Sequence, residues 1–380
     1  MEGSQLYKRN NRCKDPSCPW KGVWLGGDLC FSTAEALKDL SLEYNATTRQ
    51  YQDQPGISIK ALGFGETCKV EYLMTSPIET GCPIQLPLMS YFHNFVKYFV
   101  AQGYERNKTI RGAPYDWRFA PDQLQERGYY GSVKALIEQM YKDGGNKKVT
   151  LVAHSMGGPV TLYFLNNVVT QAWKDTYVNA FVPLSGAWSG SSKIVMWQIS
   201  GERFMEISLL QGLCHFPPNT VLLFRNASRT LPSLLFLLPE PSVRGNAVLV
   251  STRLRNYTAG DYTDLFNDIG HSRAGLVYNS VRGINAGFPP PRVPVYCFYG
   301  VGVSTPESFV YDDGFPDSAP REVNGNGDGT VNVWSSEVCL KWRGQQAQPF
   351  VSRTFRGVSH NAMTENRDVL DAVGNIVLSV

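Results

Sequence analysis

The stretch that decides the fold is Val149-Thr-Leu-Val-Ala153-His154-Ser155-Met156-Gly157-Gly158. Its centre matches the G-x-S-x-G nucleophile elbow, with Ala153 in place of the first glycine. Small residues two positions before and after Ser155 allow a strand to turn sharply into a helix, which lifts the serine hydroxyl above the sheet. The sequence therefore predicts that Ser155 is a nucleophile and that the Met156 N–H stabilises an oxyanion. A serine in an ordinary strand–helix turn is the alternative.

A nucleophilic serine needs a base, and the chain offers five histidines. His154 adjoins Ser155 and should point away from it, and His93 lies on a predicted amphipathic helix. His215 and His271 fall in a region that we interpret below as a cap. His360 follows a predicted strand and comes last, where the order serine, acid, histidine places the base.

The acid should lie between these two residues, after a strand. The loop Asn324-Gly-Asn-Gly-Asp328-Gly-Thr330-Val fits, and Asp328 would fix the imidazole tautomer of His360. Asn324, Asn326 and Asp328 also alternate as in a calcium loop. Position twelve of such a loop would be Ser335 rather than a bidentate glutamate, so we predict no metal and no cofactor.

Around the elbow, apolar runs of strand type alternate with segments of helical periodicity. Such alternation predicts a mostly parallel sheet covered on both faces, in a single α/β domain over residues 1–380. Residues 188–290 are rich in leucine and proline and break this rhythm, so we expect a cap or lid insertion there. The predicted strands are 57–63, 147–153, 178–184, 294–299 and 350–355, and the predicted helices include 88–99, 133–141 and 159–169.

Composition narrows the functional classes. Hydrophobic residues make up 43% of the 380 residues and aromatic ones 12%, which excludes an intrinsically disordered chain. A net charge of +3 gives no case for nucleic-acid binding, and no apolar run is long enough for a transmembrane helix. Eight cysteines favour an oxidising compartment. Cys13 and Cys18 lack a second pair for zinc, so a disulfide-pinned loop is the better interpretation.

With these motifs in order, the chain resembles the lecithin–cholesterol acyltransferase family, and within it the acyl-transferring lysosomal phospholipase A2 branch. The most specific segment that supports this resemblance is Arg111-Gly-Ala-Pro-Tyr115-Asp116-Trp117-Arg118. Matching segments are Ala153–Gly157, Ala172–Asp175, Gly327–Asn332 and the cysteines Cys297 and Cys339. The resemblance implies an α/β-hydrolase fold with a cap and a small membrane-binding subdomain, at residues 10–45.

The resemblance also implies roles for individual residues. The family's triad falls on Ser155, Asp328 and His360. Cys297 should pair with Cys339, Cys13 or Cys18 with Cys30, and Cys68 with Cys82 as a local extra. The sequons at Asn45, Asn107, Asn226 and Asn256 suit a secreted glycoprotein.

One departure concerns the amino end. Family members begin with an apolar strand ending in Pro-Gly, and the residues that follow donate the second oxyanion N–H. Here Met1 or Glu2 stands where that donor is expected, so we expect a truncated chain without its first strand or signal peptide. A missing strand would leave the backbone edge of its neighbour unpaired.

The implied function is cleavage of phospholipid acyl esters at a membrane or lipoprotein surface, with acyl transfer to a lipid alcohol or to water. Lysosomal or extracellular localisation follows from the same likeness. Trp20, Trp24 and Leu25 are candidates for lipid contact, with a small local core as the alternative, and Trp117 should lie beside the pocket. The leucine-rich clusters Leu222-Leu-Phe224 and Leu234-Leu-Phe-Leu-Leu238 line an acyl tunnel or pack the cap. The alternatives are another serine lipase or esterase on the same triad, and a lipid-binding pseudohydrolase.

Overall fold

The computed structural model describes residues 4–11, 18–23, 32–45, 47–48, 50–72, 90–201 and 219–378. At its centre is a parallel sheet of four strands in the order β13-β10-β7-β6. These strands are β6 (Val149–His154), β7 (Val178–Leu184), β10 (Val295–Val301) and β13 (Phe350–Arg356). All four were predicted from apolar runs within two residues of their observed ends, and the mostly parallel α/β-hydrolase sheet is confirmed.

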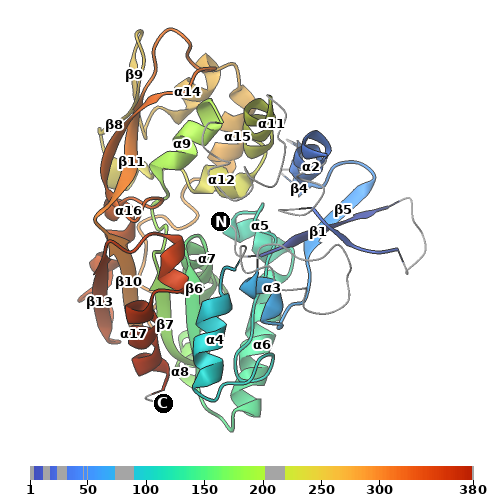
Figure 1. The fold of residues 1–380 in the computed structure, drawn as a ribbon, viewed down its shortest axis with the longest axis vertical. Coiled ribbons are helices and arrows are strands. Elements are labelled where there is room, and N and C mark those ends of the chain that lie inside the picture. The colour runs from blue at the N-terminus through green and yellow to red at the C-terminus, as the bar shows by residue number, and fades with distance from the viewer. Residues whose placement is uncertain are drawn as a thin grey trace.

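Helices cover both faces of this sheet (Figure 1). On one face, α4 (His93–Ala101) and α17 (Arg367–Val377) bury Phe95, Phe99 and Val373 against alternate residues of β7. On the other face lie α6 (Tyr129–Asp143), α7 (Gly157–Tyr163) and α8 (Gln171–Tyr177). The helix predicted over 159–169 is α7 followed by a π-helical segment, η2 (Phe164–Val168).

A second sheet, in the order β12-β11-β8-β9, was not predicted. Its strands are β8 (Val248–Ser251), β9 (Asn256–Thr258), β11 (Val303–Val310) and β12 (Arg321–Gly327). β11 pairs antiparallel with β12 and parallel with β8, so it connects the hairpin of residues 303–327 to the region of residues 188–290. The alternating asparagines of the proposed calcium loop therefore lie on a β-strand. Among the residues described, no group of three or more candidate ligands gathers for a metal.

The described part of residues 188–290 forms a layer above the carboxyl ends of the parallel strands (Figure 1). Leu234, Leu235, Leu237 and Leu238 are buried in the hydrophobic core, whereas Leu222 is 40% exposed. The helices of this layer are α9 (Ser192–Ile199), α11 (Thr220–Ser228), α12 (Pro232–Phe236), α13 (Pro241–Arg244), α14 (Tyr262–Asp268) and α15 (Ser272–Val281).

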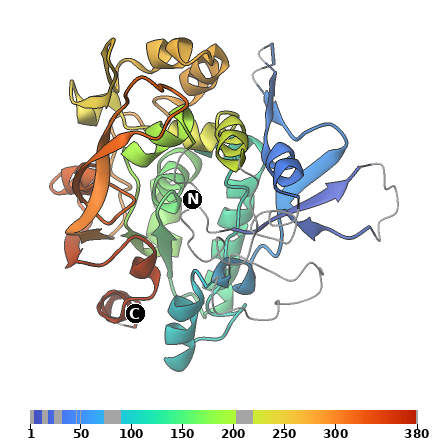
Figure 2. The same cartoon turned by 45° about the horizontal axis from the view of Figure 1, so that its top comes forward.

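The amino-terminal residues form a small lobe beside the main sheet, as Figure 2 shows. Its three-stranded sheet has the order β2-β1-β5 and is antiparallel where β1 pairs. The buried Arg118 connects this lobe to the body, because its guanidinium binds Asp116 at 2.6 Å and Asp53 at 2.7 Å. The elements here are β1 (Leu6–Asn10), β2 (Lys21–Gly22), α2 (Thr33–Leu40), β3 (Glu43–Asn45), β4 (Gln50–Gln52) and β5 (Ile57–Ala61). Two short helices contact the body: α3 (Cys68–Glu71) lies against α4, and α5 (Pro121–Glu126) against α6 and α7.

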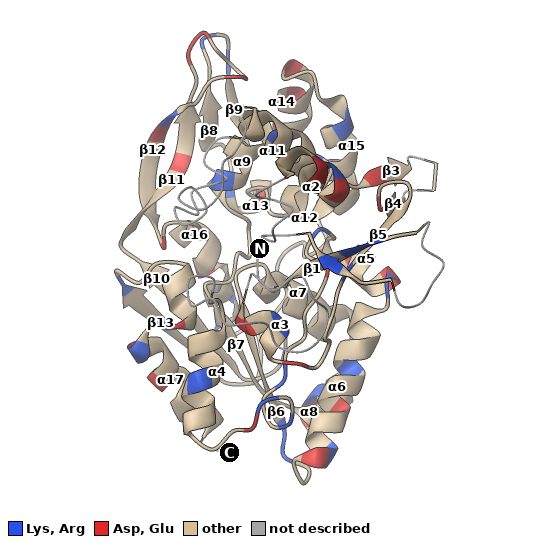
Figure 3. Ribbon diagram, turned by 45° about the vertical axis from the view of Figure 1, so that its right-hand side comes forward, with Lys and Arg blue, Asp and Glu red and all other residues tan. Residues whose placement is uncertain are grey.

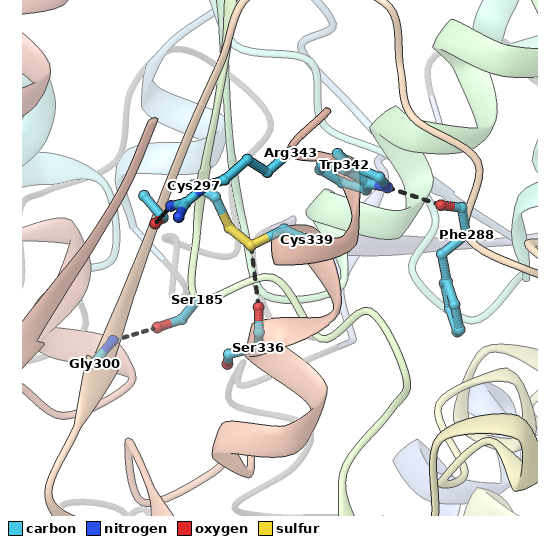
Figure 4. The surroundings of a disulfide bond; sticks show 9 residues. Ser185, Phe288, Cys297, Gly300, Ser336, Cys339, Trp342 and Arg343 are labelled. Carbon is cyan, nitrogen blue, oxygen red and sulfur yellow. Dashed lines mark hydrogen bonds between the residues drawn. A yellow bond between two sulfur atoms is a disulfide. The ribbon is translucent and has the colours of Figure 1, made fainter. Parts of the chain in front are cut away.

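Cationic and anionic side chains are interspersed along the ribbon (Figure 3). Within the described ranges, no single helix has both the length and the apolar composition needed to cross a membrane. The predicted disulfide between Cys297 and Cys339 is present and ties β10 to the short helix η3 (Glu337–Trp342), as Figure 4 shows. Cys18 is also disulfide-bonded, while Cys13, Cys30 and Cys82 lie outside the described residues.

Candidate active site

Ser155 lies at the turn between β6 and α7, at the carboxyl end of the parallel sheet. Its φ of +56° is in the left-handed region, which a non-glycine residue adopts only when the surrounding structure imposes it. The turn is tight on both sides of the serine, although a Cβ on Gly157 would still make only an ordinary contact with that of Ala153, at 3.5 Å. A Cβ on Gly158 would lie 3.1 Å from Gly186, so this position needs a glycine more stringently. The sharp turn thus follows from small residues on both sides of the serine.

His360 and Asp328 complete a hydrogen-bonded series with Ser155. The Ser155 Oγ lies 2.9 Å from His360 Nε2, and His360 Nδ1 lies 2.8 Å from Asp328 Oδ2. The three residues follow three different strands, β6, β13 and β12, and lie 205 and 32 positions apart in the chain. All three are buried, with exposed fractions of 5% for Ser155, 7% for His360 and 0% for Asp328. The fold therefore brings together the three residues that the sequence analysis selected.

The Asp328 carboxylate is held as an anion. Burial alone would raise its pKa, but the charge and hydrogen bond of His360, the Val331 amide and the Ser185 hydroxyl together lower the pKa below its ordinary value. Its Oδ1 accepts hydrogen bonds from the backbone N–H groups of Thr330, at 3.0 Å, and Val331, at 2.7 Å. Oδ1 is thereby occupied, which leaves Oδ2 for His360. Asp328 Oδ2 can accept a hydrogen bond from a protonated His360 Nδ1. This contact fixes the imidazole so that the lone pair of His360 Nε2 points toward Ser155.

The sequence analysis missed Ser185, which directly follows β7. Its Oγ accepts a hydrogen bond from the Gly300 N–H at 3.3 Å, as Figure 4 shows, and its hydroxyl also bonds to Asp328. Gly300 itself has no room for a side chain, because a Cβ there would lie 2.2 Å from the Val358 carbonyl oxygen and 3.0 Å from Asp328 Cβ. The loops that carry Asp328 and His360 thus approach each other at Gly300, where a side chain would not fit. The one sequence signal for Ser185 was its position at the end of a buried strand.

His154 takes part in the site more directly than predicted. Its Nε2 lies 2.9 Å from the carbonyl oxygen of His360, an acceptor, so Nε2 carries a proton and Nδ1 accepts from the Tyr91 hydroxyl. Its ring packs on that of His360, with centroids 4.4 Å apart. Burial, followed by the charge of His360, lowers the pKa of His154 well below its ordinary value. A neutral His154 therefore supports the loop that carries His360.

The other histidines lie away from this series. His93 is the first residue of α4 and bonds to the Tyr72 hydroxyl at 2.6 Å and to Glu71 at 3.0 Å. His271 is half-buried within the cap layer, between α14 and α15, where burial and nearby arginines lower its pKa to about 4. His215 lies outside the described residues. The described histidines thus leave His360 as the one that contacts Ser155 Oγ.

The remaining predicted contact residues are only partly described. Trp20 is half-buried, and its ring lies under two cations, with Lys60 Nζ at 4.4 Å and Arg9 Cζ at 4.9 Å from its centroid. Trp117 is 5% exposed and belongs to the hydrophobic core. Met1, Trp24 and Leu25 lie outside the described residues. Met156 is fully buried and caps the amino end of α7.

The four predicted glycosylation sites lie at the surface. Asn45, Asn107, Asn226 and Asn256 are all exposed, although they come from different elements. Asn107 also accepts a hydrogen bond from the Thr67 N–H at 2.7 Å through its side-chain oxygen. All four side chains are thus reachable from solvent.

Comparison with known proteins shows the family of this chain. Residues 20–366 match the model of the family described as lecithin:cholesterol acyltransferase. The chain is 37% identical over 360 residues to a human protein named lysosomal phospholipase A and acyltransferase, covering 94% of this chain and 82% of that one. It is 37% identical over 319 residues to the chicken phosphatidylcholine-sterol acyltransferase, covering 83% and 71%. Among solved structures, one of a Tle4–Tli4 complex gives a TM-score of 0.48 at 16% identity, covering 70% of this chain and 67% of that one.

The resemblance inferred from the motifs is therefore confirmed over most of the sequence, and it includes the elbow, the acid loop and the loop of His360. With its parallel sheet and its serine at the strand–helix turn, the chain belongs to the lecithin:cholesterol acyltransferase family.

Proposed function

We propose that this protein is a serine phospholipase and O-acyltransferase, which cleaves an acyl ester of a phospholipid and transfers the acyl group to a lipid hydroxyl or to water. The observation that carries the proposal is the hydrogen-bonded series Ser155–His360–Asp328 at a strained elbow. Membership of a family whose relatives are named phospholipase and acyltransferase supports the substrate class. We propose no cofactor for the reaction.

The reaction has two steps. In the first, His360 Nε2 takes the proton of the Ser155 hydroxyl while Oγ attacks the ester carbonyl carbon. The resulting oxyanion accepts a hydrogen bond from the Met156 N–H, and the C–O bond to the lysophospholipid then breaks as His360 returns the proton to the leaving oxygen. In the second, His360 takes a proton from water or a lipid hydroxyl, whose oxygen attacks the acyl carbonyl carbon. The bond from that carbon to Ser155 Oγ then breaks as His360 returns the proton to Oγ.

We propose that the amino-terminal lobe contacts the lipid surface through Trp20. An indole suits the interface because its ring is apolar and its N–H polar, and Arg9 and Lys60 beside it can bind anionic headgroups. Trp20→Ala should weaken binding to phosphatidylcholine vesicles containing phosphatidylserine without lowering the cleavage of a short soluble ester. Equal vesicle binding by the variant would rule out this contact.

A lysosomal or extracellular site of action is part of the proposal. The Cys297–Cys339 disulfide and the four exposed sequons suit the secretory pathway, since disulfides persist there and Asn-X-Ser/Thr is glycosylated there. Protein expressed in a eukaryotic secretory system should run at a lower apparent mass on gel electrophoresis after treatment with an N-glycosidase. An unchanged mobility would show that none of the four sequons is glycosylated.

A fluorophosphonate probe tests the chemistry directly, because it labels only an activated serine. Labelling should occur in the unmodified chain, persist in Ser132→Ala on the exposed face of α6, and disappear in Ser155→Ala. A folded chain that takes no label would be a lipid-binding pseudohydrolase. Phospholipid vesicles cleaved no faster than short soluble esters would instead indicate another serine lipase or esterase.

A further inference from the structure

Ser185 is a serine at a backbone position that favours glycine. It directly follows β7, it is fully buried, and its φ of +46° lies in the left-handed region. Glycine adopts this conformation without strain, whereas a residue with a Cβ is disfavoured there. The backbone therefore gives no reason for a serine at this turn, so the contacts of its hydroxyl decide what the residue does.

The backbone around Ser185 is held by two hydrogen bonds. The Ser185 N–H donates to the Phe298 carbonyl of β10 at 2.7 Å. The carbonyl of Leu184, one residue earlier, accepts from the Ser155 N–H at 3.1 Å. The end of β7 thus contacts the nucleophile through one residue and reaches the acid through the next. A fully buried side chain on such a backbone has a fixed place, which is the condition for positioning another group.

The hydroxyl of Ser185 donates its proton to Asp328. Its Oγ accepts the Gly300 N–H of β10 at 3.3 Å, as Figure 4 shows. A backbone N–H can only donate, so the one hydroxyl proton is left for the carboxylate of Asp328, to which the hydroxyl bonds. The hydroxyl therefore joins β10 to the acid.

With this bond the carboxylate of Asp328 has four donors. Its Oδ1 accepts from the backbone N–H groups of Thr330 and Val331. Its Oδ2 lies 2.8 Å from His360 Nδ1, and the hydroxyl of Ser185 supplies the fourth donor. A carboxylate offers about four lone-pair positions, so this one is saturated. Four donors fix its orientation and favour the anion, because a protonated carboxyl group would need an acceptor instead.

The titratable group that faces Asp328 is His360, with which it forms its one ion pair in the part of the chain that the structure describes. The contacts from β10 and β11 come through Gly300 and Val303, which carry no charge. Behind His360 lies His154 of β6, with ring centroids 4.4 Å apart. The charge of the acid is thus balanced by one imidazole and by uncharged donors, which include a single side-chain hydroxyl.

We propose that Ser185 is a positioning residue of the reaction: its hydroxyl completes the hydrogen bonds of Asp328 and thereby sets how strongly this acid holds the imidazole proton of His360. The inference rests on the serine chemistry proposed above. The positive end of the hydroxyl dipole faces the carboxylate, so it offsets part of the charge that acts on His360. Without the hydroxyl, the carboxylate would keep His360 protonated to higher pH, and a protonated Nε2 cannot take the proton of Ser155.

The competing explanation is that Ser185 only satisfies the Gly300 N–H. Loss of the hydroxyl would then leave a buried donor unpaired and lower the stability. It would not move the pH dependence of the reaction, because the charge acting on His360 would be unchanged. The pH profile therefore separates the two explanations.

The test measures the rate of fluorophosphonate labelling of the full chain between pH 4 and 8, which requires no choice of lipid substrate. In Ser185→Ala the acidic midpoint of the profile should move to higher pH by about half a unit, which is roughly a threefold change in the protonation equilibrium. The plateau rate should fall about threefold to tenfold, because the carboxylate loses one donor. Ser336→Ala is the matched control. Ser336 is 1% exposed and its hydroxyl has no hydrogen-bond partner among the described residues, so neither quantity should change.

Ser185→Gly separates the hydroxyl from the backbone. Glycine removes the hydroxyl but relieves the left-handed strain, so this variant should shift the profile as Ser185→Ala does and unfold at a higher urea concentration than Ser185→Ala. It also keeps the prediction testable if Ser185→Ala does not fold. Coincident profiles of the native chain and folded Ser185→Gly would overturn the role of Ser185 and leave the catalytic series intact. A native chain that takes no label at any pH would overturn both.

Discussion

Replacement of Asp328 by asparagine tests the catalytic series most sharply, because it removes the charge and keeps the size. The amide oxygen should stay on the Thr330 and Val331 N–H groups that now hold Oδ1. The amide NH₂ then faces His360 Nδ1, 2.8 Å away in the present structure. Two donors cannot share that hydrogen bond, so Nδ1 must become the acceptor and the imidazole proton must move to Nε2.

In that tautomer Nε2 donates to Ser155 Oγ and can no longer accept its proton. We expect kcat/KM for a phospholipid ester to fall by about 10⁴, or roughly 5.5 kcal/mol of transition-state stabilisation. Fluorophosphonate labelling should slow in parallel. Asp313→Asn is the matched control, because Asp313 has a side chain that is 71% exposed and should leave the rate unchanged.

The same variant makes a prediction about stability. Because the folded-state pKa of Asp328 is lowered, its carboxylate contributes stability that is fully present above the unfolded pKa of about 3.9 and is lost as pH falls through the folded pKa. The difference in unfolding free energy between the native chain and Asp328→Asn should therefore shrink as pH falls below 4.

For the rate prediction, a loss of kcat/KM smaller than tenfold in an Asp328→Asn variant with native circular dichroism would refute the role given to Asp328.

Three further perturbations have defined outcomes. Gly300→Ala should lower kcat/KM by at least tenfold, because its Cβ would push the Val358 carbonyl and Asp328, whereas Gly131→Ala on α6 has open space and should stay fully active. His154→Gln should flatten the dependence of the unfolding free energy on pH, because the pKa of the native His154 is lowered. The stability that a neutral His154 contributes is present above its unfolded pKa of about 6.5. As pH falls below that value, the unfolding free energy drops by up to about 1.4 kcal/mol per pH unit. An unchanged slope between pH 6.5 and 5 in urea titrations would contradict a neutral buried His154. Arg118→Met should lower the unfolding free energy by up to about 3–5 kcal/mol, since it removes the buried cation between the half-buried carboxylates of Asp53 and Asp116. Arg367→Met, at a side chain that is 74% exposed, should change it little.

The interior strand β7 could be predicted from the sequence because it is buried on both faces, whereas the edge strand β13 is largely exposed. Val178–Leu184 is apolar except for Asn179, and the structure buries every other residue of the run. The second sheet gave no such signal. Arg321–Gly327 is polar and glycine-rich and largely exposed, so its pairing with β11, which depends on backbone groups, is invisible in side-chain periodicity.

The three residues of the candidate site could be selected for a similar reason. Ser155 stands in a motif, and the acid and histidine follow strands in a fixed order. Tyr91 and Ser185 could not be found this way. The contact of Tyr91 with His154 joins positions 63 apart, and Ser185 reaches Asp328 only because β7 and β10 are neighbours.

The strand that precedes Asp328 gives this site a mechanical property. Ser155 and His360 both extend from the parallel sheet, but Asp328 extends from β12, which is held by β11 and through it by β8 of the cap layer. The carboxylate that bonds to His360 is therefore anchored to the cap layer, and the backbone carbonyl of Asp328 also accepts a hydrogen bond from the His360 N–H at 2.8 Å. We expect a displacement of the cap layer to reach the acid through the hairpin of β11 and β12.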